Sequence, residues 1–257
     1  VVVGENPLRY QKSKTCGENI DRMGLDLLGT QNQLVQKIHE TGVPTIVVLV
    51  GGRPLSVNWI AQNVQALVQA WEPGSLGGRA LANILAGKVN PSAKLPISIP
   101  RHSGQIQMIY NHKPSQYFHK YIDGPSTPLY PFGFGLSYTR FAYSSLKLSH
   151  TRISDKDSFT ASIELTNVGD REGTEVVQLY IRDIYSSATR PVKELKDFAR
   201  VTLKPGEKKT VTFTVTPDKL AYWNRNMQYG VEKGEFEIMI GSSSQDKDLK
   251  KVKMEVL

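Results

Sequence analysis

The sequence predicts two domains of different fold class, an α/β domain followed by an all-β sandwich. In residues 1–140, apolar runs alternate with helical segments, which is typical of a mostly parallel sheet with helices on both faces. In residues 141–257, short segments alternate apolar and polar side chains between turns, which is typical of strands. The chain of 257 residues is long enough for two domains of roughly 100–150 residues each.

The first half begins with three β-branched residues, 1–3, which predict a buried parallel strand. A helix is expected next, with Thr30 and Gln33 as a capping box and Gly42 at its end. The continuous apolar run at 45–50 predicts a strand that is covered on both faces.

The remaining elements of this half continue the alternation. We expect a short helix at 57–63, a strand at 66–71, a helix at 76–86 with Ser75 as its N-cap, and an edge strand at 94–99. The carboxyl ends of parallel strands meet at one edge of a sheet, where ligands bind in such folds. Segments 4–22, 51–54 and 71–75 should therefore share one functional rim.

The second half predicts about seven strands. Residues 159–167 alternate apolar and polar side chains throughout, and segments 176–181, 211–215, 236–240 and 252–256 are further strand candidates. This spacing is typical of an immunoglobulin-like or fibronectin type III-like sandwich. Cys16 is the only cysteine, so the inter-sheet disulfide of antibody-type domains is excluded.

Aromatic and glycine residues alternate at 130–139, where the two halves meet. Aromatic rings need buried partners, and glycines let the backbone pass close to its neighbours. This segment is therefore expected to be a rigid strap between the domains.

Composition excludes several classes of function. The net charge of +8 is scattered, so no nucleic-acid surface is expected, and no apolar run approaches the roughly 20 residues that span a bilayer. The five histidines are dispersed, and only His112 and His119 are close in sequence, so no metal site is expected. The glycine turn at 51–54 lacks the spacing of a nucleotide-binding loop and is better explained as a tight turn with a buried arginine.

Carboxylates are the remaining candidates for chemistry. Glu5 and Glu18 lie in the long loop after the first strand, and either could act as a general acid at the rim. Solvated glutamates, or an ion pair with Arg22, would explain the same residues without catalysis.

Several motifs resemble the C-terminal part of glycoside hydrolase family 3, the β-glucosidase and β-xylosidase family. The resemblance covers essentially the whole chain, in the family's order. It is carried by GGRPL at 51–55, WEPGSLGG at 71–78, NPSAKLP at 90–96, YPFGFGLSYT at 130–139, NVGDREG at 167–173, RPVKEL at 190–195 and LKPGE at 203–207.

The resemblance implies a retaining, exo-acting β-glycosidase built from a barrel, an α/β domain (here 1–140) and a fibronectin type III-like domain (here 141–257). This chain would be a piece of that polypeptide, inactive without the barrel that carries an aspartate nucleophile. A β-glucosidase is the main expectation. The alternatives are a β-xylosidase, a catalytically inactive member, and a non-catalytic carbohydrate-binding or scaffold module.

The resemblance also implies the site residues. Glu18 begins the segment Glu18-Asn19-Ile20-Asp21-Arg22, which is similar to the family's acid/base segment, although Asn19 replaces a glycine and Leu28-Gly29 stands where Leu-Pro-Gly is common. Glu18 is therefore the expected general acid/base, with Glu5 as the alternative. Asp21 and Arg22 would position the loop, and neither a cofactor nor a metal is implied.

The implied partners are a β-linked oligosaccharide or glycoside and the N-terminal barrel of the same enzyme, with no nucleic acid and no membrane insertion. The resemblance is greatest to bacterial periplasmic β-glucosidases, which implies a periplasmic or secreted location. A carbohydrate-binding module would instead present exposed aromatic side chains. The candidates, which are more typical of core and edge positions, are Tyr180, Tyr185, Tyr222, Trp223 and Tyr229.

Overall fold

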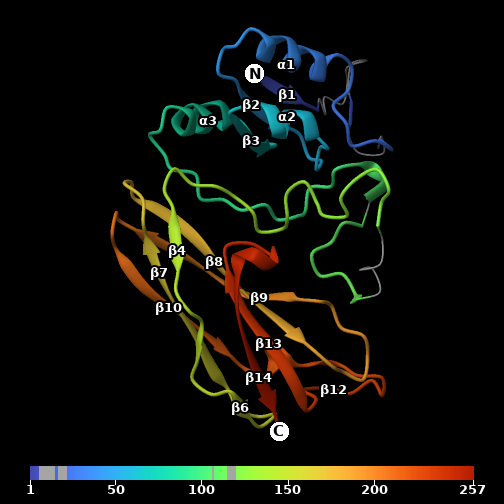
Figure 1. Cartoon of the computed structure of the whole chain (residues 1–257), viewed down its shortest axis with the longest axis vertical. Helices are drawn as coiled ribbons and strands as arrows, with labels where there is room; N and C mark the ends of the chain where they lie inside the picture. Colours follow the sequence, from blue (N-terminus) through green and yellow to red (C-terminus); the bar gives the residue numbers. More distant parts are fainter. Residues whose placement is uncertain (6–14, 17–21, 106, 115–119) are drawn as a thin grey trace. The chain divides into compact units, whose positions relative to one another are not determined.

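The computed structural model describes residues 1–5, 15–16, 22–105, 107–114 and 120–257, which form two compact units (Figure 1). The first unit comprises Val1–Val89, Ser98–Met108 and Gly124–Tyr130, and the second comprises Asn90–Ile97, Ile109–Asp123 and Pro131–Leu257. Residues 90–130 are thus divided between the two units.

The first unit is built on a three-stranded parallel sheet, as the sequence predicts. The strand order is β1 (Val2–Gly4), β2 (Ile46–Val50) and β3 (Ala66–Trp71). Val47 and Leu49 of β2 are buried in one apolar core, because β2 is the central strand.

Three α-helices accompany this sheet in the described part of the first unit. They are α1 (Gln31–Glu40), α2 (Asn58–Asn63) and α3 (Gly77–Leu85). Val35 of α1 and Ile60 of α2 are fully buried in the same core as β1 and β2. Gly42 follows α1 at a φ of 78° and donates its N–H to the carbonyl of His39, so the predicted glycine stop is confirmed.

Two capping predictions and one strand prediction are wrong. Thr30 precedes α1 without a side-chain capping bond, and the N-cap of α3 is Leu76, not Ser75. Residues 94–99 form no strand, and Ile99 makes only an isolated bridge with Tyr130. Proline at position 96 removes a ladder donor in the middle of that segment.

The second unit is a β-sandwich, which confirms the predicted all-β class. One sheet has the order β10-β7-β4, with β5 also paired to β7, and the other has the order β6-β14-β13-β8-β9. The strands of these sheets are β4 (Phe141–Tyr143), β5 (Lys147–Leu148), β6 (Arg152–Ile153), β7 (Phe159–Asn167), β8 (Gly173–Asp183), β9 (Glu194–Leu203), β10 (Lys208–Val215), β13 (Gly234–Gly241) and β14 (Leu249–Val256).

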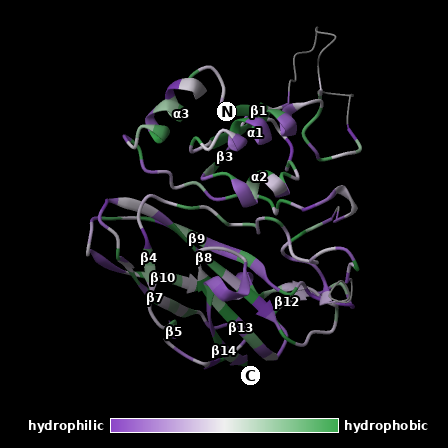
Figure 2. Ribbon diagram, turned by 45° about the horizontal axis from the view of Figure 1, so that its top comes forward, coloured by the Kyte–Doolittle hydropathy of each residue, from purple (hydrophilic) through white to green (hydrophobic). Residues whose placement is uncertain are grey.

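Apolar side chains at alternate positions along the strands form the core of the sandwich (Figure 2). The predicted strand at 159–167 coincides with β7, whose alternate residues from Phe159 to Asn167 are buried. β9 was not expected from the alternation of apolar and polar residues, because this strand lies at the edge of its sheet and much of it is charged and only partly buried. Between β10 and β13 lie the short helix α4 (Pro217–Leu220) and a separate ribbon of β11 (Tyr222–Trp223) and β12 (Tyr229–Gly230).

The aromatic and glycine segment at 130–139 makes the close contacts that its composition predicts, within the second unit from Pro131 onward. Phe132 stacks on Tyr110 with 4.2 Å between ring centroids. Gly133 has a φ of 78°, and a Cβ there would lie 2.1 Å from Oε1 of Gln178. The role of this segment as an interdomain strap stays a prediction.

Candidate functional site

The candidate site lies where the three parallel strands of the first unit end. The N–H of Glu5, just after β1, donates to the carbonyl of Val50 at 2.8 Å, and the N–H of Gly51 donates to the carbonyl of Trp71 at 3.0 Å. The described parts of the three predicted loops therefore begin side by side at one rim. Parallel pairing is the reason, because it aligns all the carboxyl ends.

The centre of this rim is a buried carboxylate held by two arginines. The Glu5 side chain is 1% exposed, and its Oε1 accepts from Nη1 of Arg53 at 2.9 Å and from Nη1 of Arg22 at 3.2 Å. Arg22 also donates to the carbonyl of Asp26 at 2.5 Å. Charge-assisted bonds of this kind are stronger than neutral ones, so Glu5 ties the Gly51–Pro54 turn to the chain around Arg22.

The second oxygen of Glu5 lies against a glycine. Oε2 is buried and finds no hydrogen-bond partner in the described structure. A Cβ on Gly51, whose φ is 146°, would lie 3.1 Å from this oxygen and 3.0 Å from the Cβ of Glu5. Glycine at this position therefore leaves the space that the carboxylate occupies.

Gln31 fixes the strand that carries Glu5. Its side-chain Oε1 accepts from the N–H of Gly4 at 2.7 Å, and its Nε2 donates to the carbonyl of Gly4 at 3.0 Å. These bonds imitate a neighbouring strand on the outer edge of β1, which has β2 on its other side. Gln31 was not expected from the sequence, because an amide bonded to backbone 27 residues away leaves no local pattern.

Cys16 and Glu72 also lie near this cluster. Burial, and then the Glu5 carboxylate, raise the pKa of the Cys16 thiol, and Arg53 acts in the opposite direction. A Cβ on Gly52 would lie 3.6 Å from Oε1 of Glu72. The buried Arg53 is expected from the sequence. Cys16 has no partner cysteine, and Glu72, although it lies in the WEPGSLGG motif, has no signal of its own that assigns it a role.

The structure describes only some of the predicted catalytic residues. Glu18 and Asp21 lie outside the described residues. Glu5 is buried and bonded to two guanidinium groups, and Arg22 is bonded to Glu5. The roles of Glu18 as acid/base, of Glu5 as its alternative, and of Asp21 and Arg22 as positioning residues stay predictions.

The described residues contain no group of three or more His, Cys, Asp or Glu side chains that could hold a metal ion. No helix in the described part of the chain is both long enough and apolar enough to cross a membrane.

The aromatic candidates for carbohydrate binding divide into two groups. Tyr180 and Tyr222 are buried, which confirms the expectation of core positions for them. Tyr185 follows β8 and is 79% exposed, so the expectation is wrong for this residue. Trp223 and Tyr229 face each other across the β11–β12 ribbon, with ring centroids 5.4 Å apart, and are 60% and 56% exposed.

Comparison with known families gives two matches. Residues 1–138 match the model of the glycosyl hydrolase family 3 C-terminal domain, and residues 175–244 match that of the fibronectin type III-like domain. More than half of the chain is therefore covered by the first model.

The proteins that are similar to this chain in sequence or structure carry names that agree with these two family matches. A β-xylosidase of Formosa agariphila is 48% identical over 95% of this chain, and a periplasmic β-glucosidase of Salmonella typhimurium is 43% identical over 88%. The solved structure of the β-glucosidase EmGH1 from Erythrobacter marinus covers the whole chain with a TM-score of 0.92 and 41% identity. The chain spans 34%, 31% and 34% of these three proteins, respectively.

Proposed function

The chain belongs to glycoside hydrolase family 3, and from this premise we propose that it is the C-terminal portion of a retaining, exo-acting β-glycosidase. The proposed reaction is the hydrolysis of terminal non-reducing β-D-glucosyl residues. The chain supplies the general acid/base, and the aspartate nucleophile lies on an N-terminal barrel. The proposed substrate is a β-linked oligosaccharide or glycoside.

One observation in the rim supports Glu18 as the acid/base. The segment that contains Glu18 runs between Cys16 and Arg22, and both of these described residues are near Glu5. The residues on both sides of the Glu18 segment are therefore at this rim, which is the edge where parallel sheets bind ligands.

The proposed mechanism follows from the charge of two carboxyl groups. Retaining glycosidases hold them roughly 5–5.5 Å apart. A free glutamic acid has a pKa of about 4.3, but burial beside an ionised nucleophile keeps it protonated at neutral pH. Glu18 then protonates the leaving oxygen. This transfer leaves Glu18 as a carboxylate. It stays ionised because the glycosylated nucleophile has lost its charge, and it then takes a proton from the attacking water.

Glu5 and Arg53 have a positioning role in this proposal. Glu5 holds Arg22, which begins the described chain after the Glu18 segment, and Arg53 holds Glu5 from the turn after β2. Oε1 of Glu5 already accepts from two cations, so this carboxylate is suited to anchoring the loop and Glu18 is left for proton transfer. Asp21 and Arg22 share the positioning role.

The test is Glu18→Ala in the full-length enzyme, with Glu40→Ala on an exposed helix surface as the matched control. Rates on substrates with poor leaving groups should fall by roughly 10²–10⁴-fold, the usual contribution of general acid–base catalysis. Azide should partly restore turnover of substrates with good leaving groups. Unchanged kinetics on both substrate types would exclude Glu18.

β-Xylosidase activity is the second candidate, because the relative with 48% identity carries that name. The ratio of kcat/KM for 4-nitrophenyl β-glucoside and β-xyloside decides between the two sugars. A higher value for the xyloside would replace the glucosidase proposal and leave the role of Glu18 unchanged.

A periplasmic or secreted location is supported by the periplasmic relative from Salmonella typhimurium. Fractionation of cells that express the full-length gene tests it. Activity retained with the cytoplasmic fraction would contradict this location.

A further inference from the structure

An exposed aromatic pair lies on the β11–β12 ribbon of the second unit. Trp223 and Tyr229 are directly opposite each other in this antiparallel ribbon, so their side chains lie on the same face of it. They are 60% and 56% exposed, and their ring centroids are 5.4 Å apart. The other two tryptophans of the chain, Trp59 and Trp71, are partly buried. Trp223 is therefore the tryptophan whose ring is open to a ligand.

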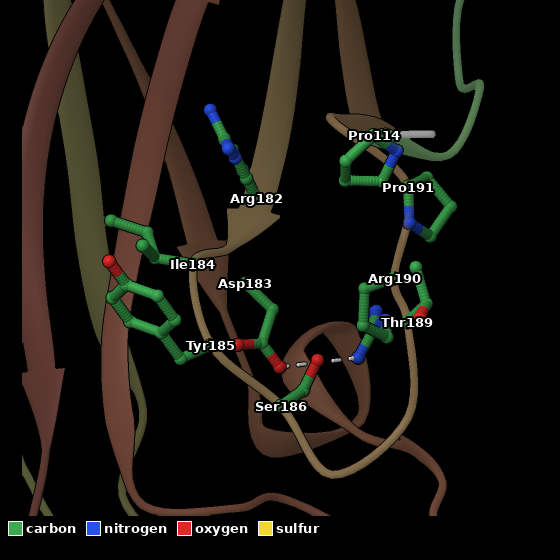
Figure 3. Close-up of a pocket in the computed structure, with 9 residues that line it drawn as sticks. All are labelled: Pro114, Arg182, Asp183, Ile184, Tyr185, Ser186, Thr189, Arg190 and Pro191. Atoms are coloured by element: carbon green, nitrogen blue, oxygen red, sulfur yellow. Dashed lines mark ion pairs between the residues drawn. The ribbon is translucent and has the colours of Figure 1, made fainter. Parts of the chain in front are cut away.

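The opposite face of the ribbon attaches it to the sandwich. Tyr222 is buried, and its hydroxyl group accepts from the N–H of Ser187 at 3.1 Å. The centroid of its ring is 4.4 Å from the guanidinium carbon of Arg190, which Figure 3 shows beside Asp183 where β8 ends. Neighbouring residues of a strand point to opposite faces, so the burial of Tyr222 turns Trp223 outwards.

The turn that joins the two strands of the ribbon is braced by side-chain hydrogen bonds. Oδ1 of Asn224 accepts from the N–H groups of Asn226 and Gln228, at 2.9 and 3.1 Å. Arg225 donates two bonds to the carbonyl of Ser187, at 3.1 and 2.9 Å. A surface that is held in this way loses little conformational freedom on binding, which favours affinity.

The residues between the two rings suit a ligand rich in hydroxyl groups. A cross-strand aromatic pair can serve stability alone, because two-stranded ribbons are marginally stable. The chain at 224–228, however, is Asn-Arg-Asn-Met-Gln, and all of it except Asn224 is exposed. Amide and guanidinium groups donate hydrogen bonds to hydroxyl oxygens, and aromatic faces contact the C–H groups of sugars. This combination is typical of carbohydrate recognition.

The size and charge of the ribbon disfavour a macromolecular partner of another class. An aromatic side chain buries roughly 150–250 Å², so the exposed parts of the two rings offer at most about 300 Å². A stable protein interface buries about 800 Å² on each partner. Single-stranded nucleic acids also stack on aromatic rings, but they need a positively charged groove, and Arg225 is the only charged residue at 222–230.

The tilt of the rings selects a single glycan chain. The planes of Trp223 and Tyr229 are at 52° to each other. A flat crystalline polymer surface would contact both rings only if they were coplanar, whereas a single chain turns from one sugar to the next and can follow the tilt. The separation of 5.4 Å between the ring centroids is similar to the spacing of neighbouring sugars along an extended β-linked chain.

We propose that Trp223 and Tyr229 form a binding face for a single chain of a β-linked glycan, with neighbouring sugars on the two rings. The choice of this ligand class rests on the proposed function, whose substrate is a β-linked oligosaccharide or glycoside. The ribbon is a second site, however, because it lies in the second unit and takes no part in bond cleavage. Its role is to retain a longer glycan on the protein.

The test is a titration of the full 257-residue chain with cellohexaose, laminarihexaose and xylohexaose, followed by amide and indole NMR signals. Saturable shifts should appear in residues 222–230 and in the indole N–H of Trp223. The indole signals of Trp59 and Trp71 should stay unchanged. Glucose can cover only one ring and should bind several-fold more weakly than the hexasaccharides.

Three variants and one control locate the binding. Trp223→Ala and Tyr229→Ala should each weaken it roughly fivefold or more, the usual effect of truncating an aromatic anchor. Trp223→Phe keeps an aromatic ring and should retain most of the affinity, and the signal that it loses identifies the Trp223 indole. Phe198→Ala is the matched control, because Phe198 is 59% exposed on β9. It should change the affinity less than about twofold.

Four outcomes would overturn the proposal. They are the absence of saturable shifts with every hexasaccharide, shifts confined to the first unit, unchanged affinity in Trp223→Ala, and an equal loss in Phe198→Ala. The shift of the Trp223 indole in the wild-type chain decides the matter even if the alanine variants disturb the ribbon.

Two further controls distinguish other occupants of the same face. Shifts of residues 222–230 with vesicles of phosphatidylcholine and phosphatidylglycerol, but not with glycans, would assign the face to a lipid surface instead. Shifts that depend on protein concentration alone would assign it to a second copy of the chain. The readout involves no hydrolysis, so a negative result for Glu18→Ala would leave it unaffected.

Discussion

Glu5 in the first unit and Asp183 in the second are two buried carboxylates with opposite surroundings. Each has an arginine partner and one oxygen without a hydrogen-bond partner among the described residues. Glu5 accepts from two guanidinium groups, at 2.9 and 3.2 Å. Asp183 has a single arginine at 3.7 Å, which Glu194 shares.

Both side chains are buried, so burial does not explain the difference. The number of cations beside each carboxylate decides whether it can act as an anchor between loops. Two cations around Glu5 make it an anchor that joins separate loops. A single shared cation and the nearby Glu232 and Glu194 leave the Asp183 carboxylate poorly compensated. The variants below alter one side of this comparison at a time.

The largest expected effect comes from removing the charge of the anchor. Glu5→Gln leaves two guanidinium groups without their carboxylate, and loss of one partner in a buried ion pair costs about 3–4 kcal/mol. Urea unfolding of the chain, with hydrogen exchange in β1 and β2 as the local readout, measures this loss. Glu40→Gln, which removes an exposed ion pair with Lys37, should change stability by about 0.5 kcal/mol or less. Equal effects of both variants would show that Glu5 is no anchor.

The next effect is a pH dependence at Asp183. Its pKa is raised to about 6 in the folded chain. The unfolded chain therefore releases this proton at lower pH, and the stability that the protonated form contributes is lost as pH rises from about 4 to 6. Asp183→Asn removes this titration. Between pH 4 and 7, the unfolding free energy of the wild type should therefore fall by about 2–3 kcal/mol relative to that of Asp183→Asn. Urea unfolding at each pH measures it, and a difference that stays constant with pH would contradict the raised pKa.

A smaller effect tests how closely the anchor is packed. Gly51→Ala would place a Cβ 3.0–3.2 Å from the Glu5 side chain, at a φ of 146° that other residues rarely adopt. A cost of about 2 kcal/mol is expected from this strain. Gly24→Ala is the matched control, because a Cβ there meets nothing within 4 Å. Thermal unfolding of both variants compares the positions, and similar melting temperatures would mean that Glu5 can move away.

The smallest expected effect comes from removing the planar guanidinium group of Arg190 while keeping its positive charge. Arg190→Lys keeps one positive charge but loses the planar group over Tyr222 and the geometry of the bond to Glu194. A loss of about 1 kcal/mol is expected. Arg152→Lys, in an exposed pair with Glu255, is the control and should change stability by less than about 0.5 kcal/mol. Indistinguishable unfolding of these two variants would show that Arg190 acts as a point charge.

Sequence patterns predicted the elements whose periodicity is strong. The apolar run at 45–50 gave the central strand β2, and the alternation at 159–167 gave β7. Prediction failed where tertiary partners outweigh local signals. Gln31 bonds to Gly4 although Thr30 and Gln33 suggested a capping box, and β9 pairs with β8 despite a charged, half-buried sequence.

By itself the sequence determined the fold class of each half, the family resemblance and the choice of Glu18 as the acid/base candidate. Local periodicity and contiguous motifs carry that information, because strand and helix periods are set by neighbouring residues. Only the tertiary structure decided that Arg22 and Arg53 converge on one oxygen of Glu5, and that Asp183 is buried with one oxygen without a hydrogen-bond partner among the described residues. Arg53 and Glu5 are 48 positions apart, and burial and distance between such residues arise only when the strands pair and the loops close over them.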